Sequence, residues 1–281
     1  NLGVFYPQGG IGALVDAVAG LAQELGVRVL LNRPATRISR RAESGLTVDT
    51  EEGPLDADAV VAAADYHHVE TQLLDPADRQ YSDGYWRRRV WAPSAFLLYL
   101  GIQGETPELA HHSLVLPTGW SGHFADLFDD PAWPQDPAYY LCVPSRTDPT
   151  VAPPGHTNLF VLVPVAAGLE DTDAGRARYR DKILADIARH TGARLADRIV
   201  LERSFCVRDF AARYHAAHGT ALGLSHTLAQ SAFGRPRRRS TRLQGLYFAG
   251  AYTTPGIGMP MCLISGEHTA ATLARDLVRR R

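Results

Sequence analysis

Residues 245–270 read GLYFAGAYTTPGIGMPMCLISGEHTA and combine three signals of a ligand-binding turn. The run 246–249 is apolar and aromatic and is closed by Gly250, as is typical of a buried strand. Residues 255–258 then force a loop, and Pro260 suits the first turn of a helix. A strand, a glycine loop and a helix N-terminus in this order leave free N–H groups and the positive end of a helix dipole beside the loop. The segment predicts a cofactor-binding loop, although the same three parts have a purely structural role in many folds.

The segment 249–270 resembles the C-terminal flavin signature of the carotenoid (phytoene) desaturases, which belong to the FAD-dependent amine-oxidase-like superfamily. The resemblance implies that FAD is the cofactor and that the loop and helix start lie against its isoalloxazine and ribityl parts. Met261 stands where the family pattern has a small residue. The cofactor-binding residues implied by this match are Gly250, Ala251, Pro255, Gly258, Met259, Pro260 and Met261.

Two further stretches are similar to the same family. Residues 7–39 and 55–65 resemble the middle of these desaturases, which implies that the backbone of Ala35 meets the adenine of FAD. Residues 111–128 and 139–165 resemble the substrate domain of the phytoene-desaturase branch, which implies a hydrophobic polyene substrate. The GGxG at 9–12 is no dinucleotide fingerprint, because no adequate strand precedes it and no acidic residue ends a strand about 20 residues later.

The composition limits the possible partners. With 45% hydrophobic residues, 21% charged residues and a net charge of −1, the chain gives no global argument for nucleic acid or an anionic membrane. We therefore expect no nucleic-acid partner, and the arginine run within 235–242 is more typical of a solvated turn. The three cysteines have no CxxC spacing, so a reducing, cytoplasmic location is expected. No apolar stretch reaches the ~20 residues of a spanning helix, so any contact with a membrane surface is expected to be peripheral.

Local patterns predict the elements along the chain. Residues 11–25 have helical periodicity that Gly26 ends, and the apolar run 57–64 is typical of a strand buried on both faces. Further predicted strands are 1–6, 27–31, 35–40, 46–50, 94–102, 111–116, 139–143, 158–165, 197–206 and 246–249, and further predicted helices are 173–192, 207–215 and one that starts near 260. The strands between 94 and 165 return regularly enough to predict one antiparallel sheet.

The resemblance implies a fold of the α/β plus α+β class with a split domain. Residues 1–65 and 240–281 would form part of a glutathione-reductase-like FAD-binding domain that lacks its N-terminal Rossmann βαβ unit. Residues 66–239 would be an inserted antiparallel-sheet substrate domain. The chain opens at Asn1 inside an apolar segment, so we expect a C-terminal fragment of a longer protein.

The expected reaction is desaturation of a phytoene-like or carotenoid polyene. The resemblance implies hydride transfer from an allylic carbon to the flavin, with proton loss from the adjacent carbon and a quinone or oxygen as the final electron acceptor. Amine substrates are disfavoured, because Gly258 stands where amine oxidases place an aromatic residue and Lys182 is the only lysine. Two alternatives remain, a related flavoenzyme such as a non-redox carotene isomerase or an oxidase of another hydrophobic ring system, and a catalytically inactive lipid-binding truncated module.

No catalytic residue and no metal site is predicted. His111 and His112 are adjacent on a predicted strand, where neighbouring side chains point to opposite faces, so at most one could face a substrate. A structural role is favoured for both. No set of His, Cys and carboxylate residues has the spacing of metal ligands.

Overall fold

The computed structural model describes residues 5–279, and its contacts divide the chain into two compact units. The first unit, here the sheet unit, contains the residues up to Leu31 together with Ala95–Cys206. The second, here the loop unit, contains Asn32–Ser94 together with the residues from Val207 onward. Each unit is therefore built from two separate stretches of sequence.

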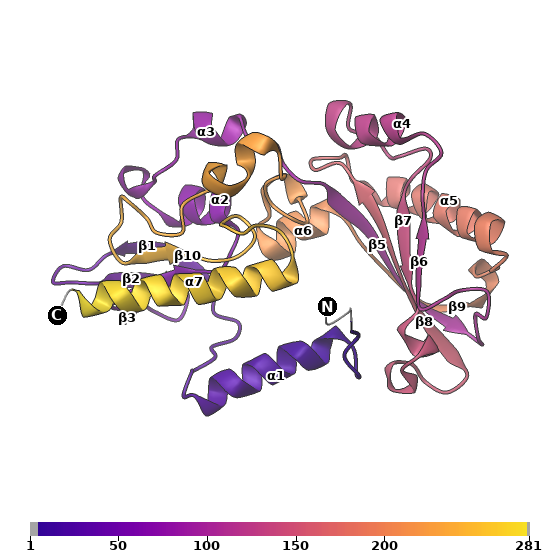
Figure 1. Cartoon of the computed structure of the whole chain (residues 1–281), viewed down its shortest axis with the longest axis horizontal. Helices are drawn as coiled ribbons and strands as arrows, with labels where there is room; N and C mark the ends of the chain where they lie inside the picture. Colours follow the sequence, from indigo (N-terminus) through magenta and orange to yellow (C-terminus); the bar gives the residue numbers. More distant parts are fainter. Residues whose placement is uncertain (1–4, 280–281) are drawn as a thin grey trace. The chain divides into compact units, whose positions relative to one another are not determined.

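The sheet unit is organised around a five-stranded sheet (Figure 1). Its strands, in spatial order, are β6 (His112–Val115), β7 (Tyr139–Cys142), β8 (His156–Val165), β5 (Ser94–Gln103) and β9 (Ile199–Phe205). The pairs β6–β7 and β7–β8 are antiparallel, as predicted, and β5 also pairs antiparallel with β9, which lies outside the set of strands predicted to form this sheet.

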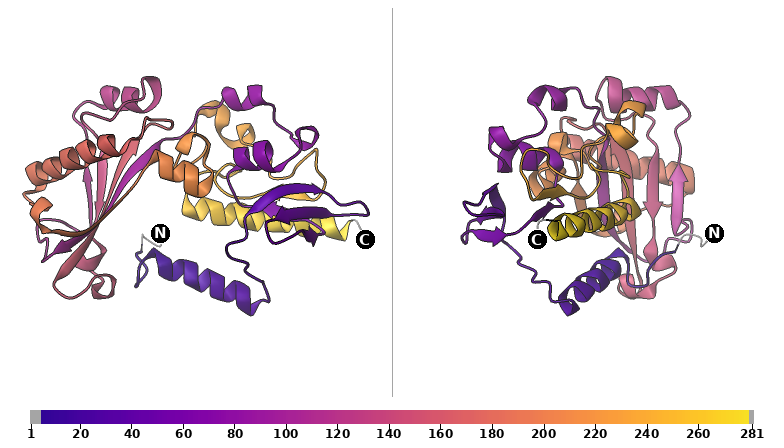
Figure 2. Two further views of the ribbon diagram at one scale, coloured as in Figure 1. Left: turned by 180° about the vertical axis from the view of Figure 1, so that it is seen from behind. Right: turned by 60° about the vertical axis from the view of Figure 1, so that its left-hand side comes forward.

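Helix α5 (Asp173–Thr191) covers one face of this sheet, seen from behind in Figure 2. The helix begins where Thr172 Oγ1 accepts a hydrogen bond from Gly175 N at 3.0 Å, and it ends at Gly192 in the left-handed conformation. The predicted apolar face of α5 is confirmed, since Tyr179, Ile183, Leu184 and Ile187 are all buried. Tyr179 meets Phe96 of β5 edge-on, with ring centroids 5.6 Å apart.

The opposite face of the sheet carries no such helix. Along β8 the burial alternates strictly, with odd-numbered residues buried and even-numbered residues partly exposed. Phe160 of β8 contacts Tyr99 of β5, whose side chain is exposed, at 5.3 Å between ring centroids. This second face, here the open face, is available to a ligand.

Helix α1 (Ile11–Glu24) forms as its periodicity predicts, but none of its residues is buried. Among its apolar positions, Val15 and Leu21 are more than half exposed. Two contacts join the residues before α1 to the rest of the sheet unit. Gly9 N donates to Asp148 Oδ2 at 2.6 Å, and Tyr6 packs edge-on against His111 at 4.9 Å.

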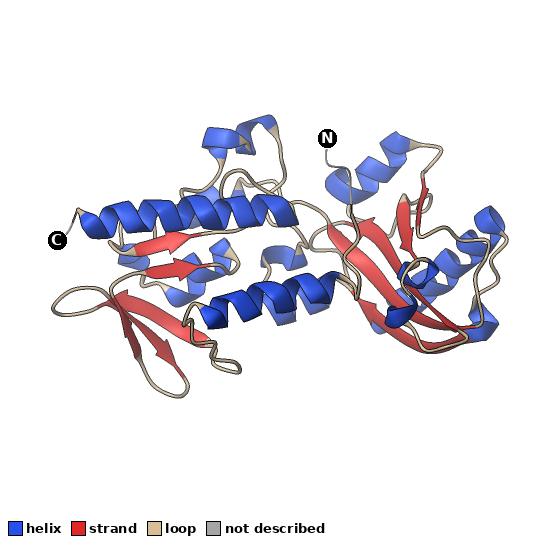
Figure 3. Cartoon of the chain, turned by 60° about the horizontal axis from the view of Figure 1, so that its bottom comes forward, coloured by secondary structure: helices blue, strands red, loops and turns tan. Residues whose placement is uncertain are grey.

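The loop unit contains two small sheets and a long C-terminal helix (Figure 3). One sheet is antiparallel and consists of β1 (Ala35–Arg40), β2 (Leu46–Thr50) and β3 (Leu55–Ala57). The other is the parallel pair of β4 (Val60–Ala62) and β10 (Leu246–Phe248). Helix α7 (Met259–Val278) lies beside β10.

Two buried hydrogen bonds fix α7 on β10. Thr269 Oγ1 donates to the carbonyl of Phe248 at 3.0 Å, and the Tyr247 hydroxyl donates to Asp276 at 2.8 Å. Losing the Thr269 hydroxyl would take a hydrogen bond from the buried Phe248 carbonyl, whereas Asp276 would keep its ion pair with Arg239 at 3.3 Å. The remaining helical turns are α2 (Tyr66–His68), α3 (Asp83–Arg87), α4 (Trp120–Phe124), α6 (Val207–Tyr214), η1 (Val69–Leu73), η2 (Pro76–Asp78), η3 (Ala125–Asp129), η4 (Pro144–Arg146), η5 (Pro149–Val151), η6 (Ala196–Arg198), η7 (Ala217–Gly219), η8 (Leu228–Gln230) and η9 (Ala232–Gly234).

Several predicted elements differ in the structure. Residues 27–31 form no strand and are exposed. The run 57–64 was predicted to be one strand buried on both faces. Instead, residue 57 is the last of β3 and residues 60–62 form the short β4, where Val61 is 43% exposed. Within residues 5–279, β4 pairs with β10 alone, so the run is not part of the larger parallel sheet in which strands are covered on both faces. Of the predicted first strand, residues 1–4 lie outside the described residues and residues 5–6 form no strand.

The two compact units meet after Leu31, after Ser94 and after Cys206. The domain boundaries predicted from the sequence lie after residue 65 and before residue 240. An aromatic core explains why the flanking segments join the loop unit. Tyr66 stacks on Phe248 at 3.7 Å, and Trp86 packs against Tyr66 at 5.9 Å. These contacts tie residues 66–94 to β10 rather than to the five-stranded sheet.

A helix both long and apolar enough to span a bilayer is not found within residues 5–279.

Candidate cofactor loop and substrate face

The chain leaves β10 into a loop that is fastened to α7 by a buried serine. Ser265 Oγ accepts a hydrogen bond from Gly250 N at 3.0 Å and lies 2.7 Å from Thr253 Oγ1. Thr253 Oγ1 also donates to Gly250 O at 3.1 Å. All three contacts draw the start of the loop onto the first turns of the helix.

Helix α7 begins with an uncapped N-terminus. Gly258 is the N-cap residue, with a φ of 123°, and no side chain caps the helix. Pro260 lies in the first turn, as predicted, and no acidic residue is present there. The first N–H groups and the positive end of the helix dipole are therefore available to an electron-rich ligand.

The glycines of the loop show which side of it is bare. A β-carbon at Gly250 would meet no atom within 4 Å, and one at Gly258 would meet only Met261 Cγ at 3.6 Å. A β-carbon at Gly256 would instead collide with His226. The loop is thus packed on the side of Gly256 and open at Gly250 and Gly258.

Two arginines lie against the loop. Arg235 is 5% exposed and donates to the carbonyls of Ala251 at 3.0 Å and Leu224 at 3.1 Å. Arg238 donates to the carbonyl and the hydroxyl of Thr254 at 3.2 and 2.9 Å. The Nε atoms of both arginines are buried without a hydrogen-bond partner among the described residues. Burial lowers the pKa of Arg235, and burial followed by the charge of Arg235 lowers the pKa of His226.

A tyrosine connects the loop to the end of β4. The Tyr252 hydroxyl donates to Asp65, and Asp65 also caps α2 by accepting from His68 N at 2.8 Å. Burial, together with the nearby Asp65 carboxylate, raises the pKa of Tyr252 well above its ordinary value. Tyr252 therefore stays a neutral donor at physiological pH and holds the loop to the parallel strand pair.

The structure places most of the predicted cofactor-binding residues together. Gly250, Ala251, Pro255, Gly258, Met259, Pro260 and Met261 follow one another on this loop and the first turn of α7. Ala35 belongs to the same unit but opens β1 in the antiparallel sheet, where it is exposed and pairs with Thr50. Sequence reasoning missed Ser265, Arg235 and Asp65, because no local pattern shows which polar side chains fold back onto the loop.

The open face of the sheet unit carries a row of aromatic rings. Successive ring centroids lie 5.3, 6.3, 5.9, 4.2 and 4.9 Å apart along Tyr99, Phe160, Tyr140, His112, His111 and Tyr6. We call this set the aromatic row. At its Tyr99 end is a pocket of about 440 Å³. Its lining is mainly apolar and includes Gly101, Pro153, Leu159, Val200 and Leu201. Such a surface suits a long hydrophobic ligand.

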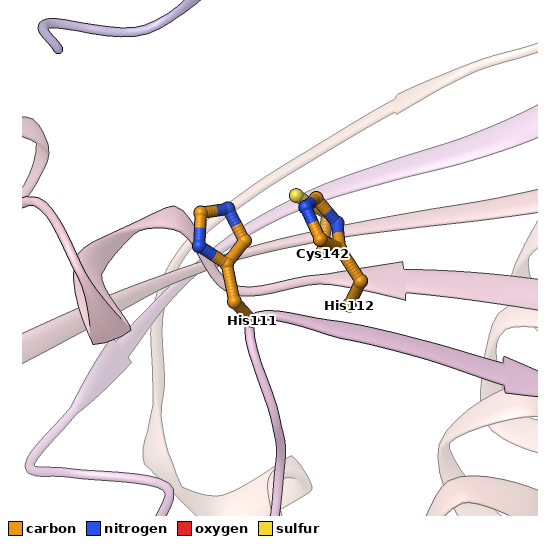
Figure 4. Close-up of side chains that lie close together, drawn as sticks. All are labelled: His111, His112 and Cys142. Atoms are coloured by element: carbon orange, nitrogen blue, oxygen red, sulfur yellow. The ribbon is translucent and has the colours of Figure 1, made fainter. Parts of the chain in front are cut away.

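The prediction that His111 and His112 point to opposite faces is wrong. Their rings stack at 4.2 Å between centroids, and both lie close to Cys142 (Figure 4). The alternation fails because β6 begins only at His112, so His111 belongs to the preceding loop. The pairing of His112 with Cys142 across β6 and β7 was not readable from the sequence.

The comparisons with known proteins agree with one another. The sequence model of the family described as Flavin containing amine oxidoreductase matches residues 2–274. The chain is 58% identical over 278 residues to carotenoid 3,4-desaturase of Haloarcula japonica, a match covering 99% of this chain and 56% of that protein. It is 35% identical over 271 residues to the zeta-carotene-forming phytoene desaturase of Myxococcus xanthus, covering 95% and 52%. The chain thus spans about half the length of these curated relatives.

A solved structure shares the fold. The crystal structure of an oxidoreductase from Methanosarcina mazei matches with a TM-score of 0.61 at 13% sequence identity, covering 94% of this chain and 55% of that one. The mixed arrangement of helices and sheets is therefore a fold also found in an oxidoreductase.

Proposed function

Because the chain belongs to the family of flavin containing amine oxidoreductases, we propose that it takes part in the FAD-dependent desaturation of a carotenoid polyene. The observation that carries this proposal is the bare loop between β10 and α7. There, two glycines leave backbone uncovered beside a helix N-terminus that no side chain caps. The relatives named above are carotenoid and phytoene desaturases, which favours a polyene as the substrate.

The residues of the loop fit the isoalloxazine part of FAD. Open β-carbon positions at Gly250 and Gly258 give a planar ring room to approach the backbone. FAD, when bound, supplies the acceptor for two electrons taken from carbon. The N-terminus of α7 favours negative charge beside it by ~0.3–1 kcal/mol, or ~2 kcal/mol where partly buried. Buried Arg235 adds a positive charge on the other side of the loop backbone.

The open face of the sheet unit would bind the substrate. The pocket and the Tyr99–Phe160 end of the aromatic row present mainly apolar surface, which suits a polyene without a charged anchor. In this proposal the rings of Tyr99, Tyr140 and Phe160 orient the chain of double bonds and exclude water from it. We assign no residue of this chain to the removal of the proton.

The finer organisation is also part of the proposal. The 281 residues contain no strand–GxGxxG–helix motif, so the pyrophosphate of FAD would be bound by a Rossmann βαβ unit elsewhere in the protein. In this arrangement the open-faced sheet is an inserted substrate domain, and Ala35 contacts the adenine. The electron acceptor would be a quinone or oxygen.

Peripheral contact with a membrane surface would give access to the lipid-soluble substrate. Leu228 and Phe233 support this part of the proposal, because they are 97% and 105% exposed on two adjacent turns, η8 and η9. Large apolar side chains that protrude in this way can enter the interface of a bilayer.

Anaerobic absorbance of the flavin tests the activity. The purified protein loaded with FAD should lose the absorbance of oxidised flavin when a C40 polyene is added, and the product should gain double bonds. A product changed only in double-bond geometry would indicate an isomerase instead. A protein that retains the polyene but no flavin would indicate a lipid-binding module, and either result would overturn the proposal.

A matched pair of variants tests the substrate face. Phe160→Ala removes the ring between Tyr99 and Tyr140 and should raise KM for the polyene while leaving flavin binding unchanged. Phe124→Ala removes an exposed ring of α4 and should leave KM unchanged. Equal KM values for the two variants would contradict the proposed role of the aromatic row.

A further inference from the structure

Three side chains with metal-binding atoms lie together at one edge of the five-stranded sheet. One ligand atom each of His111, His112 and Cys142 lies within 4.8 Å of the other two. His112 and Cys142 are direct partners in the β6–β7 register, and Val143 N donates to His111 O at 2.8 Å beside them. Figure 4 shows the three side chains projecting in the same direction. The desaturation proposed above requires none of their nitrogen or sulfur atoms.

A hydroxyl partner engages the Nδ1 atom of each histidine, which leaves Nε2 on the other side of the ring. His111 Nδ1 lies 2.7 Å from Thr147 Oγ1, and His112 Nδ1 lies 2.6 Å from the Tyr140 hydroxyl. When each Nδ1 carries the proton and donates it, Nε2 keeps its lone pair. Histidines that bind metals are usually oriented by such a bond from the second nitrogen.

The Nε2 atom of His111 gives an independent indication of a ligand. It is buried and has no hydrogen-bond partner among residues 5–279. A buried polar atom without a partner costs free energy, so its presence in a native structure needs an explanation such as an ion. A metal ion bonded to this nitrogen would supply the missing partner.

The geometry points to a zinc-type metal site with His111 Nε2, His112 Nε2 and Cys142 Sγ as ligands. Two imidazoles and a thiolate are ligands preferred by Zn²⁺, whereas Ca²⁺ and Mg²⁺ prefer oxygen. Bonds of about 2.0–2.3 Å in tetrahedral geometry place ligand atoms roughly 3.3–3.7 Å apart, so the present spacing must close by about 1 Å. The exposed position of His112 at the start of the edge strand β6 leaves room for this closure. A water molecule would take the fourth position.

Such an ion would stabilise the edge of the five-stranded sheet. It would join the edge strand β6 to β7 by bonds between side chains, in addition to the ladder hydrogen bonds. It would also fix the ring of His111, against which Tyr6 packs edge-on. The site would therefore stabilise the end of the aromatic row whether or not the protein desaturates a polyene.

Cobalt titration tests the site, because Co²⁺ replaces Zn²⁺ and absorbs light when bound to thiolate. After treatment with a chelator and removal of the chelator, the full chain should bind one Co²⁺ per molecule with a thiolate-to-cobalt absorption band, and Zn²⁺ should displace it. Cys142→Ser should abolish the band. His111→Ala and His112→Ala should each weaken binding by at least about tenfold, which is the lower range for loss of a residue that merely orients a ligand.

Two substitutions outside the cluster serve as matched controls. Cys262→Ser removes a partly exposed thiol of the loop unit, and His190→Gln removes an exposed imidazole of α5. Both should bind Co²⁺ as the parent does. Absence of the band in the parent, or its persistence in Cys142→Ser, would overturn the proposal, as would its loss in Cys262→Ser.

A thermal measurement keeps the test valid if a variant is less stable. Zn²⁺ that binds only the folded chain raises Tm with its concentration. We expect this rise in the parent and in both controls and no rise in Cys142→Ser, each compared with its own metal-free Tm. An equal rise in Cys142→Ser would contradict the assignment of Cys142 as a ligand.

Discussion

Ser265 is the residue on which the position of the cofactor loop depends. Replacing it by alanine leaves Gly250 N without its acceptor in a buried site. We expect Ser265→Ala to lower the free energy of unfolding by about 1–3 kcal/mol, measured by urea titration, and to weaken FAD binding. Ser121→Ala, at an exposed position of α4, should stay within about 0.5 kcal/mol of the parent. Equal stability of the two variants would show that the bond to Gly250 does not hold the loop.

Asp148 makes the stability of the sheet unit depend on pH. Its carboxylate accepts hydrogen bonds from Thr150 Oγ1 at 2.6 Å, Thr150 N at 2.9 Å and Gly9 N at 2.6 Å. The bonds from Thr150, followed by the bond from Gly9, hold the pKa of Asp148 below its usual value. The unfolded chain therefore takes up this proton first as the pH falls. The stabilisation is complete above the usual carboxyl pKa of about 4 and is lost as the pH falls through the lower folded value.

Asp148→Asn tests this dependence. The variant should be less stable than the parent at pH 7, because one amide oxygen cannot replace both carboxylate oxygens. The difference between their urea midpoints should shrink below about pH 4. Asp129→Asn, at an exposed position of η3, should follow the pH profile of the parent. A difference that stays constant with pH would indicate that the charge of Asp148 is not involved.

At the candidate site, the sequence predicted only those residues that belong to one contiguous motif. The succession of Gly250, Pro255, Gly258 and Pro260 was readable because strand, loop and helix start are contiguous. Arg235 and Asp65 were not readable, because their bonds to the loop follow from tertiary packing. Their role in binding FAD, like that of the loop itself, stays a prediction. Membership of the family, predicted from residues 249–270, is confirmed by a match across residues 2–274.

Helix α7 offers two glycines whose replacement should have opposite effects. Gly258, at the N-cap, has a φ of 123°, which a residue with a β-carbon rarely adopts. Gly258→Ala should therefore lower the free energy of unfolding by about 1–2 kcal/mol. Gly266 lies within the helix, and a β-carbon there would meet no neighbour. Gly266→Ala should raise stability by up to about 1 kcal/mol.

Urea titration of both α7 variants checks this contrast. The two substitutions add the same methyl group to the same helix, so a difference in sign isolates the backbone conformation from the change in size. A stabilising Gly258→Ala would show that this position relaxes to an ordinary helical cap.

Among the elements, the predictions were correct where a clear hydrophobic periodicity was bounded by residues that start or end a helix or strand. Helix α5 lies between Thr172 and Gly192, and the strands β1 and β2 have the bounds that were predicted. The prediction of a strand at 27–31 was wrong, because an apolar run becomes a strand only with a partner, and these residues are exposed without one in the described structure. Helix α1 was predicted correctly, but periodicity could not reveal that no residue of it is buried in this structure.

For the whole molecule, the near-zero net charge bears on the proposed contact with a membrane. With a net charge of −1, binding should depend little on anionic lipid or on salt and should follow the exposed apolar side chains. We expect the protein to sediment with neutral phosphatidylcholine vesicles. The double variant Leu228→Ser and Phe233→Ser should reduce the bound fraction several-fold, because each substitution removes a large apolar side chain from the interface.

The control for vesicle binding is a pair of exposed apolar residues elsewhere, Val15 at 62% and Leu21 at 56%. Val15→Ser combined with Leu21→Ser removes such side chains from α1 and should leave the bound fraction unchanged. Stronger binding to anionic vesicles that disappears with added salt would instead indicate recognition by basic residues.

The parallel pairing of β4 with β10 has a consequence for synthesis on the ribosome. Val60–Ala62 leaves the exit tunnel long before its partner Leu246–Phe248, which lies far downstream in the chain. Until then Tyr66 lacks the ring of Phe248, and the aromatic core of the loop unit stays exposed to solvent. The nascent chain should therefore recruit chaperones that bind apolar surface, and a stop codon placed before residue 246 should yield a product that proteases remove quickly.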